Sequence, residues 1–121
     1  MASCPRKFLI KELINVPPPV NVWLQGTIEQ TVGTNILIIS DKTGRAKITK
    51  CDTADGVIDK SSLRIGTYCC IIGTSIRTKG LPEVHASKFI DLTSQPEMKN
   101  AWELEVKEAN LVLGGNYKPS L

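Results

Sequence analysis

The sequence predicts an all-β domain with one added α-helix. Apolar and polar residues alternate along residues 20–29, which is the period of a strand with one buried face. Further short apolar runs follow, each bounded by residues that favour turns. Residues 94–113 change to the helical period. A chain of 121 residues has the size of one domain and can bury one core.

Five strands are expected, each ended by a turn. The segment 31–35 separates the first two, and Asp41-Lys42-Thr43-Gly44 forms a hairpin turn before the third. In the third strand, Ala46 and Ile48 take the inward phase. Residues 51–64 are polar and are expected as a loop or short helix. The strands are expected at residues 20–29, 36–40, 45–50, 67–75 and 82–92.

The placement of two glycines favours one type of barrel. Gly26 in the first strand and Gly73 in the fourth lie where strongly coiled strands bend to close a barrel. Five strands, a longer connection after the third and an added helix describe an oligonucleotide/oligosaccharide-binding (OB) fold. The alternative is a small SH3-like or other five-stranded barrel. We therefore expect a five-stranded OB-fold barrel over residues 20–93.

The C-terminal helix is expected over residues 94–115, with a tail at 116–121. Ser94 and Glu97 match a capping box, and Gly114-Gly115 ends the helix. Glu105 falls within the broad apolar stripe, where a carboxylate is costly unless it is paired. Leu104 and Leu111 form a second apolar strip, which indicates a partner helix. The broad stripe, anchored by Trp102, Val106 and Ala109, contains Met98, Ala101, Trp102, Val106, Ala109, Val112 and Leu113.

Residues 1–19 are expected as an N-terminal arm and a proline-rich connector. Phe8, Leu9, Leu13 and Ile14 could make one or two helical turns. Pro17-Pro18-Pro19 then stops any helix or central strand.

Some apolar residues of the barrel have an unexpected phase. If Leu37 and Ile39 point inward, Ile36 and Ile38 point outward, and Trp23 stands on the outside of the first strand. The helix and the arm could cover Trp23. Covering all of these together with Leu104 and Leu111 is harder, and an exposed apolar patch of that size usually marks an interface.

Lys88 also breaks its pattern, because strict alternation places it with Val84, Ala86 and Ile90 on the apolar phase. One interpretation is a bulge, in which Phe89 takes the inward place and Lys88 reaches solvent. The other is an ammonium fixed at an interface. The residues alone leave both open.

The chain lacks the aromatic platforms on which single-stranded nucleic acids stack. It has six aromatic residues, and none falls between Val32 and Asp52, where the second and third strands lie. A basic cluster lies in the same region. It is either a solvated outer face or a weak phosphate contact. Its members are Lys42, Arg45, Lys47 and Lys50.

No catalytic residues, metal site or cofactor are predicted. His85 has no acid or nucleophile motif around it, and the four cysteines lack metal-ligand spacing. A formal charge of +3 does not demand a polyanion. The N-terminal apolar run is too short for a signal peptide or membrane span, so we expect a soluble, intracellular chain with reduced cysteines.

Three segments resemble the second, smaller subunit of the RecQ-mediated genome instability complex. They are Val22-Trp23-Leu24-Gln25-Gly26, Lys88-Phe89-Ile90-Asp91-Leu92 and Trp102-Glu103-Leu104-Glu105-Val106. Their order and spacing are similar to that family over about residues 20–113. The pentapeptide in the helix is the specific part, since the strand motifs also fit the middle subunit of replication protein A.

The resemblance implies a non-catalytic OB subunit that binds the C-terminal OB domain of the larger subunit of that complex. Through it, the chain would join a nuclear assembly of a RecQ (Bloom-type) helicase and topoisomerase III that dissolves double Holliday junctions. Lys88 would be an interface residue, and DNA contact would be weak or indirect. The alternative function is a single-stranded DNA-binding subunit of a complex like replication protein A or a telomere cap. The residues expected to bind a partner are Lys88, Trp102, Leu104, Glu105, Leu111, Trp23, Ile36 and Ile38.

Overall fold

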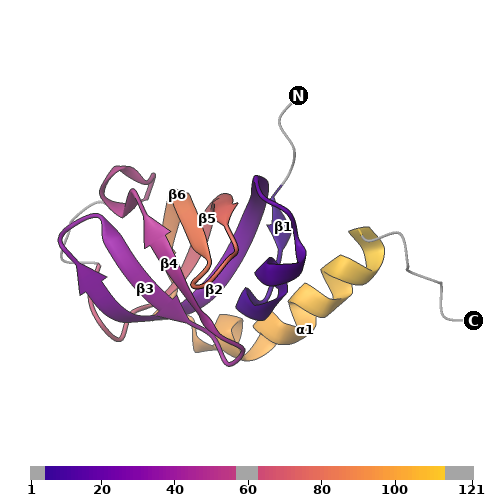
Figure 1. Ribbon diagram of the computed structural model, residues 1–121. Helices are drawn as coiled ribbons and strands as arrows, with labels where there is room; N and C mark the ends of the chain where they lie inside the picture. Colours follow the sequence, from indigo (N-terminus) through magenta and orange to yellow (C-terminus); the bar gives the residue numbers. More distant parts are fainter. Residues whose placement is uncertain (1–4, 57–62, 114–121) are drawn as a thin grey trace, which may run out of the picture.

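The computed structural model describes residues 5–56 and 63–113, with the backbone alone for residues 110–113 (Figure 1). Among these residues one six-stranded sheet curls on itself, and the C-terminal helix lies along its outside. The elements in chain order are β1 (Arg6–Lys7), the 3-10 helix η1 (Ile10–Asn15), β2 (Val20–Val32), β3 (Ile36–Ser40), β4 (Arg45–Thr49), the 3-10 helix η2 (Cys51–Thr53), β5 (Tyr68–Arg77), β6 (Glu83–Asp91) and α1 (Pro96–Leu113).

The barrel closes because β2 pairs along two different strands. Its first part, from Val20 to Thr27, is antiparallel to β5, and its last part, from Thr27 to Val32, is antiparallel to β3. The sheet order β1-β2-β3-β4-β6-β5 together with the β2–β5 pairing joins β2, β3, β4, β6 and β5 into a ring. The predicted five-stranded barrel with a C-terminal helix is therefore confirmed. β2 runs three residues further than expected, because residues 30–32 pair with Ile36–Ile38.

Two glycines allow neighbouring strands to approach closely where the barrel bends. A Cβ atom on Gly26 would lie 2.8 Å from the carbonyl oxygen of Ser40, and one on Gly73 would lie 2.1 Å from that of His85. Real Cβ atoms do not come so close to a backbone oxygen. These are the two positions at which the sequence predicted a bend, and both admit only glycine.

The core fills the barrel with the inward side chains of all five strands. Leu37 and Ile39 of β3 are buried together with Ala46 and Ile48 of β4, as the alternation predicted. The cluster that they belong to also contains Val22, Leu24, Ile28, Cys69, Ile71, Val84, Ala86 and Phe89.

The N-terminal arm is part of this core. Instead of beginning a helix at Phe8, the chain first forms β1, which pairs in parallel with Val22 and Trp23 of β2. The 3-10 helix η1 then begins at Ile10. Phe8, Ile10 and Leu13 are buried in the main core, whereas Ile14 is exposed. The arm therefore covers one side of the barrel (Figure 1).

The helix α1 begins at Pro96, so Gln95 rather than Ser94 precedes its first residue. The carbonyl oxygen of Gln95 accepts a hydrogen bond of 3.0 Å from the Met98 amide. Proline suits the first helical position because the amide that it lacks would have no partner there. The expected helix end at Gly114-Gly115 and the tail at 116–121 lie outside the described residues. Within the described part of the chain, no helix has both the length and the apolar character needed to cross a membrane.

Candidate protein-docking surface

Trp23, Ile72 and Lys88 lie in a row across the outer face of the barrel. Trp23 of β2 is paired with Ile72 of β5, which is in turn paired with Lys88 of β6. Residues directly opposite each other on paired strands project from the same face of the sheet. The row is covered at one end and open at the other, since Trp23 and Ile72 are half-buried and Lys88 is exposed.

The Trp23 end is covered by the chain itself. Trp102 and Val106 of α1 and Leu9 of the arm are buried, and Trp23 packs against them in a second apolar cluster. Trp102 is 3% exposed and Val106 is fully buried. Two of the three predicted anchors, Trp102 and Val106, therefore hold the helix, whereas Ala109 is only half-buried and lies outside this cluster. Trp102, which the sequence also assigned to partner binding, has almost no surface left for a partner while the helix lies on the barrel.

The next row of the outer face is largely buried as well. Gln25, Cys70 and Ile90 are paired across β2, β5 and β6, and the first two are buried. Burial raises the pKa of the Cys70 thiol to about 12. The hydroxyl of Tyr68 donates a hydrogen bond of 2.7 Å to the Gln25 Oε1 atom. Ile90 is half-buried at the open end of this row.

Glu105 has its partner within the chain. Its Oε1 atom lies 2.7 Å from the Nζ atom of Lys7, and that ammonium also lies 5.0 Å from the centroid of the Trp23 ring. The sequence indicated that a carboxylate in this stripe needs a partner, but the partner comes from the arm. Glu105 is therefore placed at the contact between arm and helix.

The opposite side of α1 is bare. Leu104 is 61% exposed, as expected for a strip that faces away from the barrel. Beside it, Glu103 and Lys107 form an ion pair of 3.1 Å at helical spacing, which holds the pKa of the Glu103 carboxyl below its usual value. The side chain of Leu111, the other member of the strip, lies outside the described residues.

Lys88 projects outward because β6 contains a bulge. Ile72 is opposite Lys88 while the next residue, Gly73, is opposite Ala86, so Ser87 is an extra residue in β6. Phe89 takes the inward place and is 2% exposed. This is the first of the two interpretations left open by the sequence. Lys88 forms no ion pair with any residue that the structure describes.

Ile36 and Ile38 are less exposed than the sequence predicted. Ile38 points away from the core cluster, yet it is only 9% exposed, and Ile36 is half-buried. The expectation that Ile38 offers open apolar surface is therefore wrong. Gln30 and Lys47 are paired with it on either side, and long side chains at such positions cover a neighbour with their aliphatic stems.

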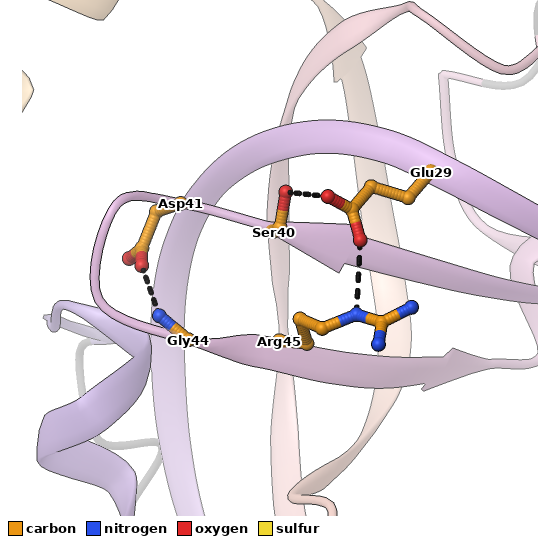
Figure 2. Close-up of polar contacts among 5 residues, drawn as sticks. All are labelled: Glu29, Ser40, Asp41, Gly44 and Arg45. Atoms are coloured by element: carbon orange, nitrogen blue, oxygen red, sulfur yellow. Dashed lines mark hydrogen bonds and ion pairs between the residues drawn. The ribbon is translucent and has the colours of Figure 1, made fainter.

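The four basic residues form a line along β4 rather than a pocket. Arg45 forms an ion pair with Glu29, in which the Glu29 Oε1 atom lies 2.9 Å from the Arg45 Nε atom (Figure 2). The Ser40 hydroxyl donates a hydrogen bond of 2.8 Å to the other carboxylate oxygen of Glu29. Lys42 lies in the turn before β4, where Asp41 accepts a hydrogen bond of 3.1 Å from the Gly44 amide. Lys50 follows β4, and Lys47 is half-buried.

The described residues contain no group of three or more His, Cys, Asp or Glu side chains that could hold a metal ion. His85 lies 3.9 Å from the carboxylate of Glu83, and both are on the outer face of β6.

Sequence analysis missed the part of the arm that contacts the helix. Lys7 and Leu9 alternate with Phe8 and Ile10, and the first pair faces α1 while the second pair enters the core. This alternation is present in the sequence, but it spans only four residues, and the apolar residues Phe8, Leu9, Leu13 and Ile14 fit helical turns equally well.

The comparisons with known proteins agree with this architecture. A chain of a replication protein A heterotrimer bound to single-stranded DNA matches with a TM-score of 0.67 and 16% identity, covering 90% of this chain and 97% of that chain. A chain of the Stn1–Ten1 complex of S. pombe matches with a TM-score of 0.63 and 12% identity, covering 88% and 96%. A chain of replication protein A from U. maydis bound to single-stranded DNA gives 0.61 and 16%, covering 92% and 97%. At these identities the likeness shows the OB fold alone.

Sequence comparison identifies the family directly. No curated protein matches the chain at a significant level. The family model described as RecQ-mediated genome instability protein 2, however, matches residues 11–110, which include the whole barrel and most of α1. The chain therefore belongs to the RecQ-mediated genome instability protein 2 family.

Proposed function

We propose that the chain is a non-catalytic OB subunit that binds the OB domain of the larger subunit of the RecQ-mediated genome instability complex. Through that subunit it would join a RecQ (Bloom-type) helicase and topoisomerase III in the nucleus. Its role there would be to stabilise the assembly that dissolves double Holliday junctions and so protects the genome. Family membership supports this proposal, and the half-covered outer face of the barrel carries it.

The first support comes from α1. A helix that is held by Trp102 and Val106 needs no apolar residue on its far side, yet Leu104 is 61% exposed there. An apolar side chain on the far side of an amphipathic helix offers a site where a second helix can pack. We assign this strip to a helix of the larger subunit.

The second support comes from the open end of the row on the outer face. Lys88 is exposed next to the half-buried Ile72, and it has no ion-pair partner among the described residues. An ammonium beside apolar surface can donate hydrogen bonds to carbonyl or carboxylate oxygens of a partner that covers both. Lys88 would then give the contact its specificity.

Co-purification with the OB domain of the larger subunit tests the proposal. We expect Leu104→Asp to lower the affinity for the partner by at least ~30-fold, because binding would then bury a carboxylate in an apolar contact. A few buried contacts of this kind carry most of the binding energy of an interface. Lys88→Ala should weaken the complex as well. Lys79→Ala in the exposed turn before β6 is the matched control and should bind like the wild type. Undiminished binding by both Leu104→Asp and Lys88→Ala would show that this surface does not bind the partner.

The second candidate is direct binding of single-stranded DNA, as a subunit of a complex like replication protein A or a telomere cap. The line of Lys42, Lys47 and Lys50 along β4 supports it, since none of the three forms an ion pair with a described residue. We expect any such contact to be weak, because β3 and β4 carry no aromatic residue. A titration with a fluorescent oligonucleotide at low and moderate salt separates the candidates, because binding to phosphates weakens steeply as salt increases.

A further inference from the structure

The N-terminal arm joins the barrel to the helix through two opposite sides. On one side, Phe8, Ile10 and Leu13 are buried in the barrel core. On the other side, Lys7 and Leu9 contact α1. The arm therefore cannot leave the barrel without uncovering the core, and it carries the helix contact with it.

The polar groups of the arm are also fixed to the barrel. The Ile10 amide donates a hydrogen bond of 2.9 Å to the Asp41 Oδ2 atom, and the Lys11 amide donates one of 3.1 Å to the Thr43 hydroxyl. Both acceptors lie in the turn between β3 and β4. In addition, the Phe8 amide donates to the carbonyl oxygen of Trp23 at 3.1 Å. The arm is thus a rigid part of the barrel surface.

The arm supplies much of the surface on which α1 rests. The strand β1 lies next to α1 (Figure 1). Leu9 packs in the cluster of Trp102 and Val106. The Lys7 ammonium lies between the Glu105 carboxylate and the Trp23 ring, and so connects the helix with β2.

We propose that residues 6–13 are a strut that fixes the position of α1 on the barrel, with Lys7, Leu9 and Glu105 as positioning residues. The strut holds Leu104 and the open end of the outer-face row in one geometry, so that a partner meets a surface already formed. This inference rests on the proposed function for the identity of the partner. Glu105 then contributes to partner binding through Lys7 rather than by touching the partner.

The strut changes affinity through the fraction of molecules in which the helix is correctly placed. If only about a tenth of the chains hold α1 in the competent position, the apparent affinity falls about tenfold, although no contact with the partner is lost. Neutralising a partly exposed ion pair has a small effect on stability. Reversing one charge acts more strongly, because two like charges then face each other across the position where the ion pair stood.

The test uses the two tryptophans of the full chain, Trp23 and Trp102, which both lie at the contact between arm, barrel and helix. The variants are Lys7→Glu, Glu105→Lys and the double variant that carries both changes. Lys79→Glu is the control, because it alters the net charge as Lys7→Glu does but lies in an exposed turn far along the chain from the contact. Tryptophan emission and acrylamide quenching report the helix position, and titration calorimetry with the OB domain of the larger subunit reports affinity.

We expect each single reversal to shift emission to longer wavelength, to increase quenching and to lower partner affinity about tenfold. The double variant should recover a large part of all three changes, because it restores the ion pair but not the contact of the Lys7 ammonium with the Trp23 ring. The control should leave all three quantities unchanged. Wild-type emission and quenching in both single variants would overturn the strut. Altered emission with unchanged affinity would overturn its role in docking. A wild-type chain that fails to bind the OB domain, while emission responds as expected, would overturn the proposed function and leave the strut supported.

Discussion

The hydroxyl of Tyr68 donates a hydrogen bond of 2.7 Å to the side-chain oxygen of Gln25, which is 1% exposed. The amide nitrogen of the same Gln25 is buried and has no hydrogen-bond partner among the residues that the structure describes. Tyr68 therefore supplies the hydrogen bond that compensates for burying this polar side chain. Lys99 of α1 lies over the Tyr68 ring at 5.5 Å, so the same tyrosine also touches the first turns of the helix.

Replacing Tyr68 by Phe should lower the free energy of unfolding by ~1–3 kcal/mol, because the Gln25 oxygen loses its donor while it stays buried. Urea denaturation followed by circular dichroism measures the change. The double variant Tyr68→Phe with Gln25→Leu is the control, because removing both polar groups should recover part of the loss. A single variant as stable as the wild type would contradict this account.

Stability should fall at alkaline pH. Burial raises the pKa of the Cys51 thiol from 9.0 to about 12, that of Cys70 to about 12, and those of Cys69 and Tyr68 as well. The folded state therefore keeps protons that the unfolded state releases above about pH 9 from the thiols and above about pH 10 from Tyr68. The stability that these groups contribute is complete below pH 9 and is lost as pH rises toward 12, at up to about 1.4 kcal/mol per pH unit for each group.

Urea denaturation in the presence of a reductant at pH 7.5, 9 and 10.5 checks this expectation. Cys70→Ala should lower the stability at pH 7.5 but should also reduce the loss between pH 9 and 10.5, since one group fewer titrates. Equal pH dependence in the wild type and the variant would show that the Cys70 thiol ionises equally well in both states.

Gly73→Ala should prevent correct closure of the barrel. The new Cβ atom would lie 2.1 Å from the carbonyl oxygen of His85 in the neighbouring strand, so β5 and β6 would have to separate. We expect a loss of more than about 4 kcal/mol, measured by thermal denaturation. Gly44→Ala is the matched control, because its nearest contact would be an ordinary 3.5 Å to the Ile10 side chain. Similar stability of the two variants would refute the steric argument.

Trp102 and Leu104 should separate folding from binding. Trp102→Ala removes a buried aromatic side chain and should lower the free energy of unfolding by about 3–5 kcal/mol. Leu104→Ala changes an exposed position and should stay within about 0.5 kcal/mol of the wild type, while it weakens binding to the larger subunit. Chemical denaturation and a binding titration on the same two variants measure both effects. Equal losses of stability would mean that Leu104 also supports the fold.

The sequence was sufficient for the barrel because its evidence is local and repeated. Alternation in β2 and the inward phase of Leu37, Ile39, Ala46 and Ile48 follow from the two-residue period of a strand, and each was confirmed. The predicted start of the helix was wrong by one residue, because Gln95 rather than Ser94 precedes Pro96. Pro96 can occupy the first helical position whichever residue precedes it.

The candidate site was less predictable because it depends on pairs that are distant in the chain. Lys7 and Glu105 are separated by 98 positions, and neither has a local pattern that indicates the other. The burial of Ile38 depends on which residues are paired with it across two strands. The orientation of Lys88 depended on a bulge, which shifts the strand by one residue and which alternation cannot distinguish from an inward lysine.

Cys69 and Cys70 are adjacent in β5, but their thiols are buried on opposite faces of the strand. The Cys69 thiol lies within the barrel and contacts the carbonyl oxygen of Gly26 at 3.6 Å, whereas Cys70 is buried on the outer face, near Trp23, Glu105 and Lys7. An alkylating reagent can therefore reach Cys70 when α1 lifts away, but it reaches Cys69 only when the barrel opens. The labelling rate of Cys70 then reports how often the helix detaches, and the labelling rate of Cys69 reports how often the barrel unfolds. The ratio of the two rates compares these two motions within one molecule.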